Sequence, residues 1–478
     1  MKLSFKNYVP FVLFVMIHYN INAQDTLQHK YTLQQCVDIA IQNNLDVKNA
    51  EFKMQSSNVY AQQAKATAIP SISANITHGI NQGRSINPYT NAYLDQQINT
   101  AQYNLGAGVV LWNGSSIQNS IKQNNLNFEA GKKDWEQAKN DLTVSVILAY
   151  LQVLSNSDQL KLAMEQALVS QKQVERLALL NKDGAIAPAT FYDQKGQLGN
   201  DELNVIATKN ALETSKLALV QLMNIPYSTD MQLEPVNKDA LTKYNESIEE
   251  ISAQASQQLA LVKAAELRKK SAAKAVEVAK GQMLPTLSLN GNLGTNYSNA
   301  ATTLQYINTT DVATNNYVLI NNAKTMVYAP QDNYNTQKIS YGNQWKNNLN
   351  SYIGLGLQIP IFNAARLRSQ VKLAKINEQQ ITIQSQTINI RLRQAIEQAY
   401  INMNTAYDRF QMLQQQVKDY AESFRAATIK FEAGSITSVD YIIAKNNADR
   451  ANTNLIASKY DYILKTKILD YYQGKNLF

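Results

Sequence analysis

The sequence predicts an internally duplicated α+β fold in which long coiled-coil α-helices carry four β-strands per chain. Three observations support this fold class. Residues 365–433 contain neither proline nor glycine, the two strongest helix breakers. The glycine that ends this stretch, Gly434, has a counterpart 250 residues earlier at Gly184. A helix-to-strand junction at Pro70 also returns at Pro285, within closely similar sequences.

The N-terminus has the pattern of a secretory signal peptide. Lys2 and Lys6 precede an apolar run over residues 8–17, and Ala23 follows a short polar stretch. We therefore expect cleavage after Ala23, so that residues 1–23 are removed on export. No later segment has the uninterrupted apolar length of a transmembrane helix.

The first repeat is expected over residues 24–224. A helix capped by Thr32 ends at Pro70, and a β-hairpin follows over about 71–112. A long helix then covers about 115–182, and a return helix covers about 191–223. Residues 225–250 contain two prolines and little periodicity, which indicates an inter-repeat linker.

The second repeat, residues 251–478, has the same order of elements. After its first helix we expect a hairpin over about 286–362, a long helix over 365–433 and a return helix over about 439–472. Extra residues between about 296 and 345 predict a long polar loop. The long helix, of about 100 Å, carries a heptad seam, formed by Ala406, Phe410, Leu413, Val417, Tyr420, Phe424, Ala427 and Phe431.

The four predicted strands alternate apolar and polar side chains. Four strands cannot close a barrel, and the smallest membrane barrels need about eight. Several chains together would complete one, with apolar side chains toward lipid and Ser, Asn and Thr toward a wet interior. Trp112 and Phe362 end equivalent strands, which suits membrane-interface aromatics. Alternatively, the two aromatic residues cap a small soluble core.

Composition gives little support for catalysis, a metal site or a cofactor. After signal removal, His29 and His78 are the remaining histidines, and Cys36 is the single cysteine, for which a buried apolar role is expected. Gly106-x-Gly108 and Gly354-x-Gly356 lie within alternating strands rather than phosphate-binding loops. The net charge of +8 comes from basic residues scattered over helix faces, which argues against nucleic-acid binding.

The order and duplication of these features resemble TolC-type outer-membrane efflux proteins, from about Tyr31 to the C-terminus. The resemblance implies a homotrimer with a twelve-stranded barrel in outer-membrane lipid and a helical tunnel across the periplasm. It also implies a periplasmic adaptor (membrane fusion) protein and an inner-membrane pump of RND or ABC type. The chain would then conduct substrates passively outward, in efflux or type I secretion.

The two glycine turns are the candidate functional site, because glycine readily adopts the left-handed conformation that stops a helix. The resemblance makes them adaptor-docking tips at the periplasmic end, formed by Gly184, Ala185, Ile186, Gly434, Ser435 and Ile436. An ordinary helical hairpin turn is the alternative.

Asp440 matches the position of an acidic residue in the family's tunnel constriction, whereas the first repeat has Thr190 there. Three aspartates could form a cation-favouring gate, closed by polar contacts near Lys430 and Glu432. An acid in the first helical turn also stabilises the helix dipole, which leaves the two interpretations open.

Two other function classes compete with a tripartite conduit. An exported coiled-coil rod or adhesin would also use heptads and an Asn- and Thr-rich loop, but amphipathic strands have no place in it. A porin that works without partners shares the barrel but does not need helices of about 100 Å.

Overall fold

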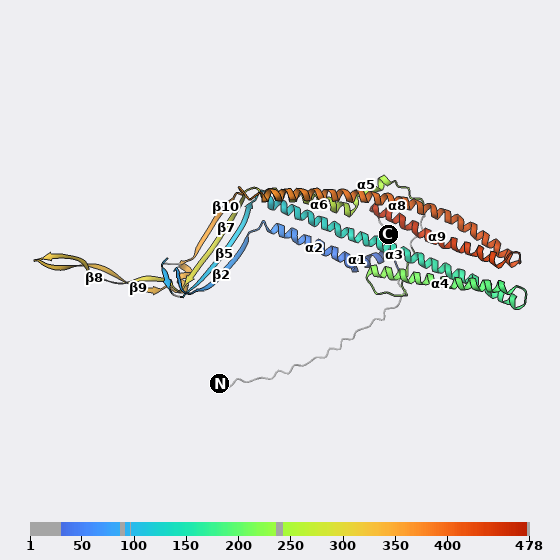
Figure 1. The fold of residues 1–478 in the computed structure, drawn as a ribbon, viewed down its shortest axis with the longest axis horizontal. Helices are drawn as coiled ribbons and strands as arrows, with labels where there is room; N and C mark the ends of the chain where they lie inside the picture. The colour runs from blue at the N-terminus through green and yellow to red at the C-terminus, as the bar shows by residue number, and fades with distance from the viewer. Residues whose placement is uncertain (1–29, 87–90, 96, 236–241, 476–478) are drawn as a thin grey trace, which may run out of the picture.

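The computed structural model describes residues 30–86, 91–95, 97–235 and 242–475. The molecule is elongated: a helical body carries a four-stranded sheet at one end, and the β8–β9 ribbon extends beyond that sheet (Figure 1). The predicted signal peptide, residues 1–23, and His29 lie outside the described residues.

Two helices of 67 residues run the length of the helical body. They are α3, Ser116–Lys182, and α8, Arg366–Glu432, each about 100 Å long. Each turns at its glycine and returns as a shorter helix, α4 over Pro188–Met223 and α9 over Ser438–Tyr472. Both turns lie at the end of the molecule farthest from the sheet (Figure 1).

The single first helix expected in each repeat is wrong, because each is broken in two. The first repeat has α1, Leu33–Asn43, and α2, Leu45–Ala66, separated by Asn44 in an extended conformation. The Asn44 side chain accepts hydrogen bonds from the backbone N–H groups of the next turn and so starts α2.

The second repeat is broken in the same way. Helices α5, Ile248–Gln258, and α6, Ala260–Gly281, are separated by Leu259, whose backbone is also extended. The predicted linker is therefore partly structured: α5 begins within it, and β6, Gln232–Leu233, pairs in parallel with β1, Lys30–Tyr31.

The strands of both repeats join into one sheet, in the order β10-β7-β5-β2. Strands β2, Ser71–Asn81, and β5, Ile98–Trp112, form the first hairpin, and β7, Thr286–Ser298, pairs with β10, Asn350–Gln358. The antiparallel β5–β7 ladder connects the repeats. This arrangement leaves β2 and β10 as edge strands in a single chain.

The register divides the sheet into an apolar and a polar face, as the alternation predicted. A β-bulge between Val110 and Trp112 shifts the last residue of β5, so that Trp112 lies opposite Leu287 on the apolar side. The apolar face carries Ile72, Ala74, Ile76, Tyr103, Leu105, Ala107, Leu287, Leu289, Leu293, Ile353, Leu355 and Leu357.

The long polar loop expected over about 296–345 is wrong. This segment contains a β-ribbon, β8 over Thr302–Ile320 and β9 over Ala323–Lys338, followed by the short helix α7, Tyr341–Asn347. Asn321 and Asn322 turn the ribbon with φ values of 52° and 68°. Asn tolerates this left-handed conformation, which two-residue hairpin turns require. At the corresponding place of the first repeat, the described residues form a small β3–β4 ribbon, Arg84–Ile86 and Tyr93–Asp95.

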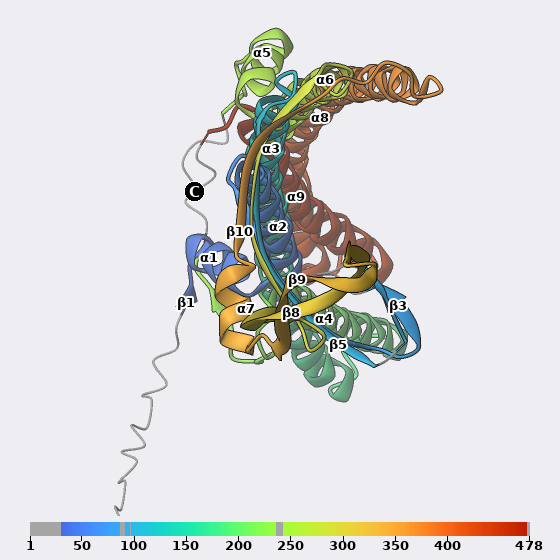
Figure 2. The same cartoon turned by 90° about the vertical axis from the view of Figure 1, so that its left-hand side faces the viewer.

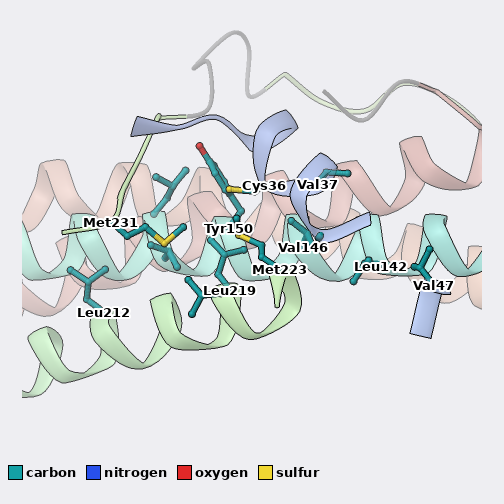
Figure 3. Packing of buried hydrophobic residues seen from close by; sticks show 14 residues of the cluster. Cys36, Val37, Val47, Leu142, Val146, Tyr150, Leu212, Leu219, Met223 and Met231 are labelled. Carbon is teal, nitrogen blue, oxygen red and sulfur yellow. The ribbon is translucent and has the colours of Figure 1, made fainter. Parts of the chain in front are cut away.

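The main apolar core lies where α1 packs against α3 and α4 (Figure 3). Cys36 is buried there, and burial raises the pKa of its thiol to about 12. Next to it, the Tyr150 hydroxyl lies 2.5 Å from the carbonyl oxygen of Glu234 and 3.0 Å from that of Tyr31. Cys36 is thus a small core side chain. Among the described helices, none is both long and apolar enough to cross a membrane.

Candidate functional site at the helix turns

The two glycine turns have the same hydrogen-bonded geometry. At the first turn, the N–H of Gly184 donates to Asn181 O at 3.1 Å and the N–H of Ala185 donates to Leu180 O at 2.8 Å. At the second, Gly434 donates to Phe431 O at 3.1 Å and Ser435 donates to Lys430 O at 2.8 Å. These are Schellman motifs, which satisfy the last carbonyl groups of α3 and α8.

Conformation, rather than space, requires glycine at both turns. Gly184 and Gly434 have φ values of +67° and +68°, and a Cβ built on either glycine would meet no atom within 4 Å. Ala185 and Ser435 are exposed, whereas Ile186 and Ile436 are half-buried. The molecule thus ends in two tightly formed turns that offer exposed backbone and small side chains.

Asp440 belongs to a capping box at the start of α9. Its backbone N–H donates to Thr437 Oγ1 at 3.2 Å, and its carboxylate accepts the Thr437 hydroxyl at 2.7 Å and the Thr437 N–H at 3.2 Å. The hydrogen bond from the Thr437 hydroxyl lowers the pKa of the Asp440 carboxyl, with the backbone bond second. Asp440 is exposed and is therefore a fixed negative charge near the turn.

The first repeat lacks this capping box. Helix α4 begins with Pro188, and Ala187 before it provides no side-chain cap. Thr190 is half-buried, and its N–H donates to Ala187 O at 3.0 Å. The two repeats therefore differ in charge at this one position, Thr190 against Asp440, although their glycine turns are alike.

Glu432 connects the two helical hairpins beside the turns. Its carboxylate lies 2.9 Å from the Arg176 guanidinium on α3. Behind it, Tyr441 is buried and stacks on Phe431, with ring centroids 4.8 Å apart. These contacts tie α8 to α3 and to α9 close to their ends.

The two candidate interface aromatics are less equivalent than the sequence indicated. Trp112 is the last residue of β5 and is 43% exposed. Phe362 lies beyond the end of β10, which stops at Gln358 before Pro360, and its side chain is 88% exposed. Both lie at the junction of sheet and helices, but Phe362 is outside the hydrogen-bonded ladder.

The described residues contain no group of three or more His, Cys, Asp or Glu side chains that could hold a metal ion. His78 lies in β2, and both glycine pairs lie within ladders: Gly106 and Gly108 in β5, Gly354 and Gly356 in β10. The register pairs these glycines with Ser and Asn residues, so they lie on the polar face of the sheet.

A family model of outer membrane efflux proteins matches residues 36–224 and 251–469. The match covers most of the chain and both repeats. The chain belongs to the outer membrane efflux protein family. It is thus a channel protein of the outer membrane, and the family is not a class of enzymes.

Relatives agree with this assignment. Outer membrane protein TolC of Vibrio cholerae is 25% identical over 407 residues, which cover 84% of this chain and 81% of the relative. The CmeC outer membrane channel of Campylobacter jejuni has a TM-score of 0.72 at 17% identity, covering 93% of this chain and 87% of CmeC. The open-state MtrE channel of Neisseria gonorrhoeae has a TM-score of 0.71 at 15% identity, covering 93% and 89%.

Sequence reasoning missed a buried ionic cluster in this efflux protein. Lys445 of α9 is 1% exposed, and its ammonium group lies 2.9 Å from Asp201 on α4 and 2.6 Å from Asp449. Asp201 also accepts hydrogen bonds from Ser170 and Gln197. Burial raises the pKa of the Asp449 carboxyl. The spacing of Lys445 and Asp449, four residues on a helix, was the available signal.

Proposed function

We propose that three copies of this chain form a continuous exit duct, with a twelve-stranded barrel in outer-membrane lipid and a helical tunnel through the periplasm. Substrates pass through it passively, and an inner-membrane pump supplies the energy. The sheet supports this assembly because its two edges, β2 and β10, are unpaired in one chain and one of its faces is mainly apolar.

The strongest support for the ring comes from the helices next to the sheet. They pack in the order α2, α3, α6, α8, so that α2 and α8 form the two edges of the layer (Figure 1). Both edges expose apolar side chains at seven-residue intervals: Leu45, Phe52 and Val59 on α2, and Ile376, Ile383 and Ile390 on α8. Heptad stripes need partner helices. Packing α2 of one copy against α8 of the next would bury both and close a ring.

A porin or a surface adhesin explains less of the molecule. An independent porin has no use for the helices of about 100 Å, and a coiled-coil rod has no use for a sheet with one apolar face. The family membership agrees with a duct that has both parts.

Disulfide trapping between the edge strands tests the ring. Cys36 is replaced by alanine, and cysteine pairs are scanned between β2 and β10 along their outer edges. A ring of three predicts bands of two and three linked chains for pairs at matching heights. Absence of any linked product across the whole scan, in protein that reaches the membrane, would contradict the shared barrel.

The partners we propose are a periplasmic adaptor of the membrane fusion type and an inner-membrane pump of the RND or ABC class. The turns around Gly184 and Gly434 support adaptor docking, since they are exposed and lie farthest from the sheet (Figure 1). A photo-crosslinking residue at Ala185 or Ser435 should link to the adaptor in cells. The same residue at Thr325, on the ribbon at the other end, is the control. Equal yields of crosslinked adaptor from the turns and from Thr325 on the ribbon would contradict docking at the turns.

Three copies of Asp440 around one axis would form a negatively charged constriction, which is our proposal for the gate. The capping box separates the two roles of this side chain. Thr437→Ala removes the cap but keeps the charge, whereas Asp440→Ala removes both. If only Asp440→Ala reduces the preference of the channel for cations, the ring is supported. Identical selectivity in both variants and the unmodified channel would leave Asp440 as a helix cap only.

A further inference from the structure

An aromatic cluster surrounds α7 at the end of the sheet farthest from the helices. The ring of Trp345 lies 4.7 Å from that of Tyr103 on β5, and the ring of Tyr341 lies 4.9 Å from that of Tyr297 on β7, measured between centroids. The Tyr341 hydroxyl donates to the Tyr103 hydroxyl at 2.7 Å. Two residues of α7 and two residues of the sheet thus form one cluster.

Hydrogen bonds hold α7 firmly on β7. The buried Gln344 side chain accepts the Ser298 N–H and donates to the Ser298 carbonyl oxygen, both at 2.9 Å. The Thr295 hydroxyl donates to Trp345 O at 3.0 Å. Despite this anchoring, Tyr341 and Trp345 remain 47% and 42% exposed. The helix therefore presents aromatic rings outward from a fixed position.

The cluster lies on the apolar face of the sheet. Tyr103 follows the register of Leu105 and Ala107, and Tyr297 follows that of Leu293. Figure 2 shows α7 on the same side of the strands as α1, away from the β3–β4 ribbon. In the proposed barrel this is the side that faces lipid, since the opposite side carries the Asn and Ser residues.

The length of β5 separates the aromatic cluster from Trp112 by about the thickness of the apolar band of an outer-membrane barrel. Tyr103 and Trp112 are nine residues apart on β5, which is about 30 Å along a strand. With a barrel tilt of about 35–45°, the vertical separation is about 21–25 Å, close to the apolar band of about 25 Å in outer-membrane barrels. Trp and Tyr gather at both boundaries of such a band, and exposed Lys346 suits the headgroup level.

We propose that α7 with Tyr103 and Tyr297 is a membrane-interface anchor that binds the headgroup and upper acyl region of the outer leaflet. This inference rests on the proposed barrel and adds its outer lipid boundary. The occupant is the lipid surface itself: the rings enter the interface, while the hydrogen bonds to β7 prevent α7 from lifting away.

Depth-dependent quenching of tryptophan fluorescence tests the anchor. The chain has three tryptophans, Trp112, Trp135 and Trp345. The variant W112F/W135F retains only Trp345, and the matched control W112F/W345F retains only Trp135, which is partly buried against the helical core. Each channel is inserted into phosphatidylcholine vesicles whose acyl chains carry bromine near the ester groups or near the chain ends.

Bromine near the ester groups should more than halve the emission of Trp345 and quench it more strongly than bromine near the chain ends. Emission of Trp135 should stay unchanged. Trp345 that escapes both brominated lipids and is quenched by aqueous iodide would overturn the anchor. Native mass and conductance are measured on the same samples, so an assembled channel with unquenched Trp345 refutes only the anchor. A sample that neither assembles nor conducts would refute the barrel as well.

Discussion

The ammonium group of Lys445 lies 2.9 Å from Asp201, and this buried contact joins α9 to α4 across the two repeats. Asp449, one turn along α9, supplies a second carboxylate at 2.6 Å. Among the ion pairs of the described residues, Lys445 is the cation that contacts two carboxylates. This cluster therefore holds the return helices α4 and α9 of the two repeats together.

Replacing Lys445 by alanine should destabilise the helical body strongly. Both carboxylates would stay in place without their cation, and breaking a buried ion pair in this way costs about 3–5 kcal/mol. Urea unfolding monitored by circular dichroism at neutral pH measures the loss. Arg450→Ala, on the same helix but exposed, is the control and should change the free energy of unfolding by less than about 0.5 kcal/mol. Equal changes in the free energy of unfolding for the two substitutions would show that the buried ion pairs do not stabilise the helical body.

Alanine at Gly434 should destabilise the turn by about 1–2 kcal/mol, because the left-handed conformation brings Cβ too close to the backbone. Gly196 is the matched control. It lies inside α4 with equal space for a Cβ, so Gly196→Ala should stabilise the helix by about 0.5–1 kcal/mol. If the two substitutions change the free energy of unfolding with opposite signs in urea, the backbone φ angle determines the effect. Destabilisation by both substitutions would indicate a steric cause.

The start of α9 should loosen in acid. The pKa of Asp440 is lowered in the folded chain, so its capping contribution is present above its usual pKa of about 3.9 and is lost as pH falls further. Hydrogen exchange of the Ser438–Tyr441 amides, corrected for the intrinsic pH dependence, should therefore show protection at neutral pH that weakens near pH 3. In Thr437→Ala this pH dependence should largely disappear. Unchanged protection across the range would contradict the capping role.

A charge on either heptad stripe should prevent assembly while leaving the single chain folded. Phe52 and Ile383 are 63% and 60% exposed in one chain, so Phe52→Glu or Ile383→Glu removes little packing within it. In the proposed ring the same carboxylates would be buried without partners. Native mass spectrometry should show three chains for the unmodified protein and mostly single chains for each variant. Glutamate at exposed Thr325 of the ribbon is the control.

The regular features of this fold were accessible from the sequence because they repeat. Heptad spacing predicted the long helices, and glycine spacing located both Schellman turns at Gly184 and Gly434. Period-two alternation from Ile72 and from Ile353 correctly divided the sheet into two faces. Each of these signals extends over many residues, and the duplication allowed one copy to be checked against the other.

Local features escaped prediction because one or two residues decide them. Asn44 breaks the first helix because its side chain caps the N-terminus of α2, yet the apolar spacing continues from α1 into α2. The Asn321-Asn322 turn organises a ribbon out of a polar segment that has little alternation. The site of α7 depends on contacts with Tyr103 and Tyr297, which are far away in the chain. Such contacts become visible only once the strands are paired.

The most direct test of the central claim is to isolate the protein from outer membranes and to measure its native mass and its conductance together. A mass of three mature chains, with ion conductance in a planar lipid bilayer, is the predicted result. A product that remains in the soluble fraction, or a single chain in the membrane that conducts no ions, would contradict the proposed duct.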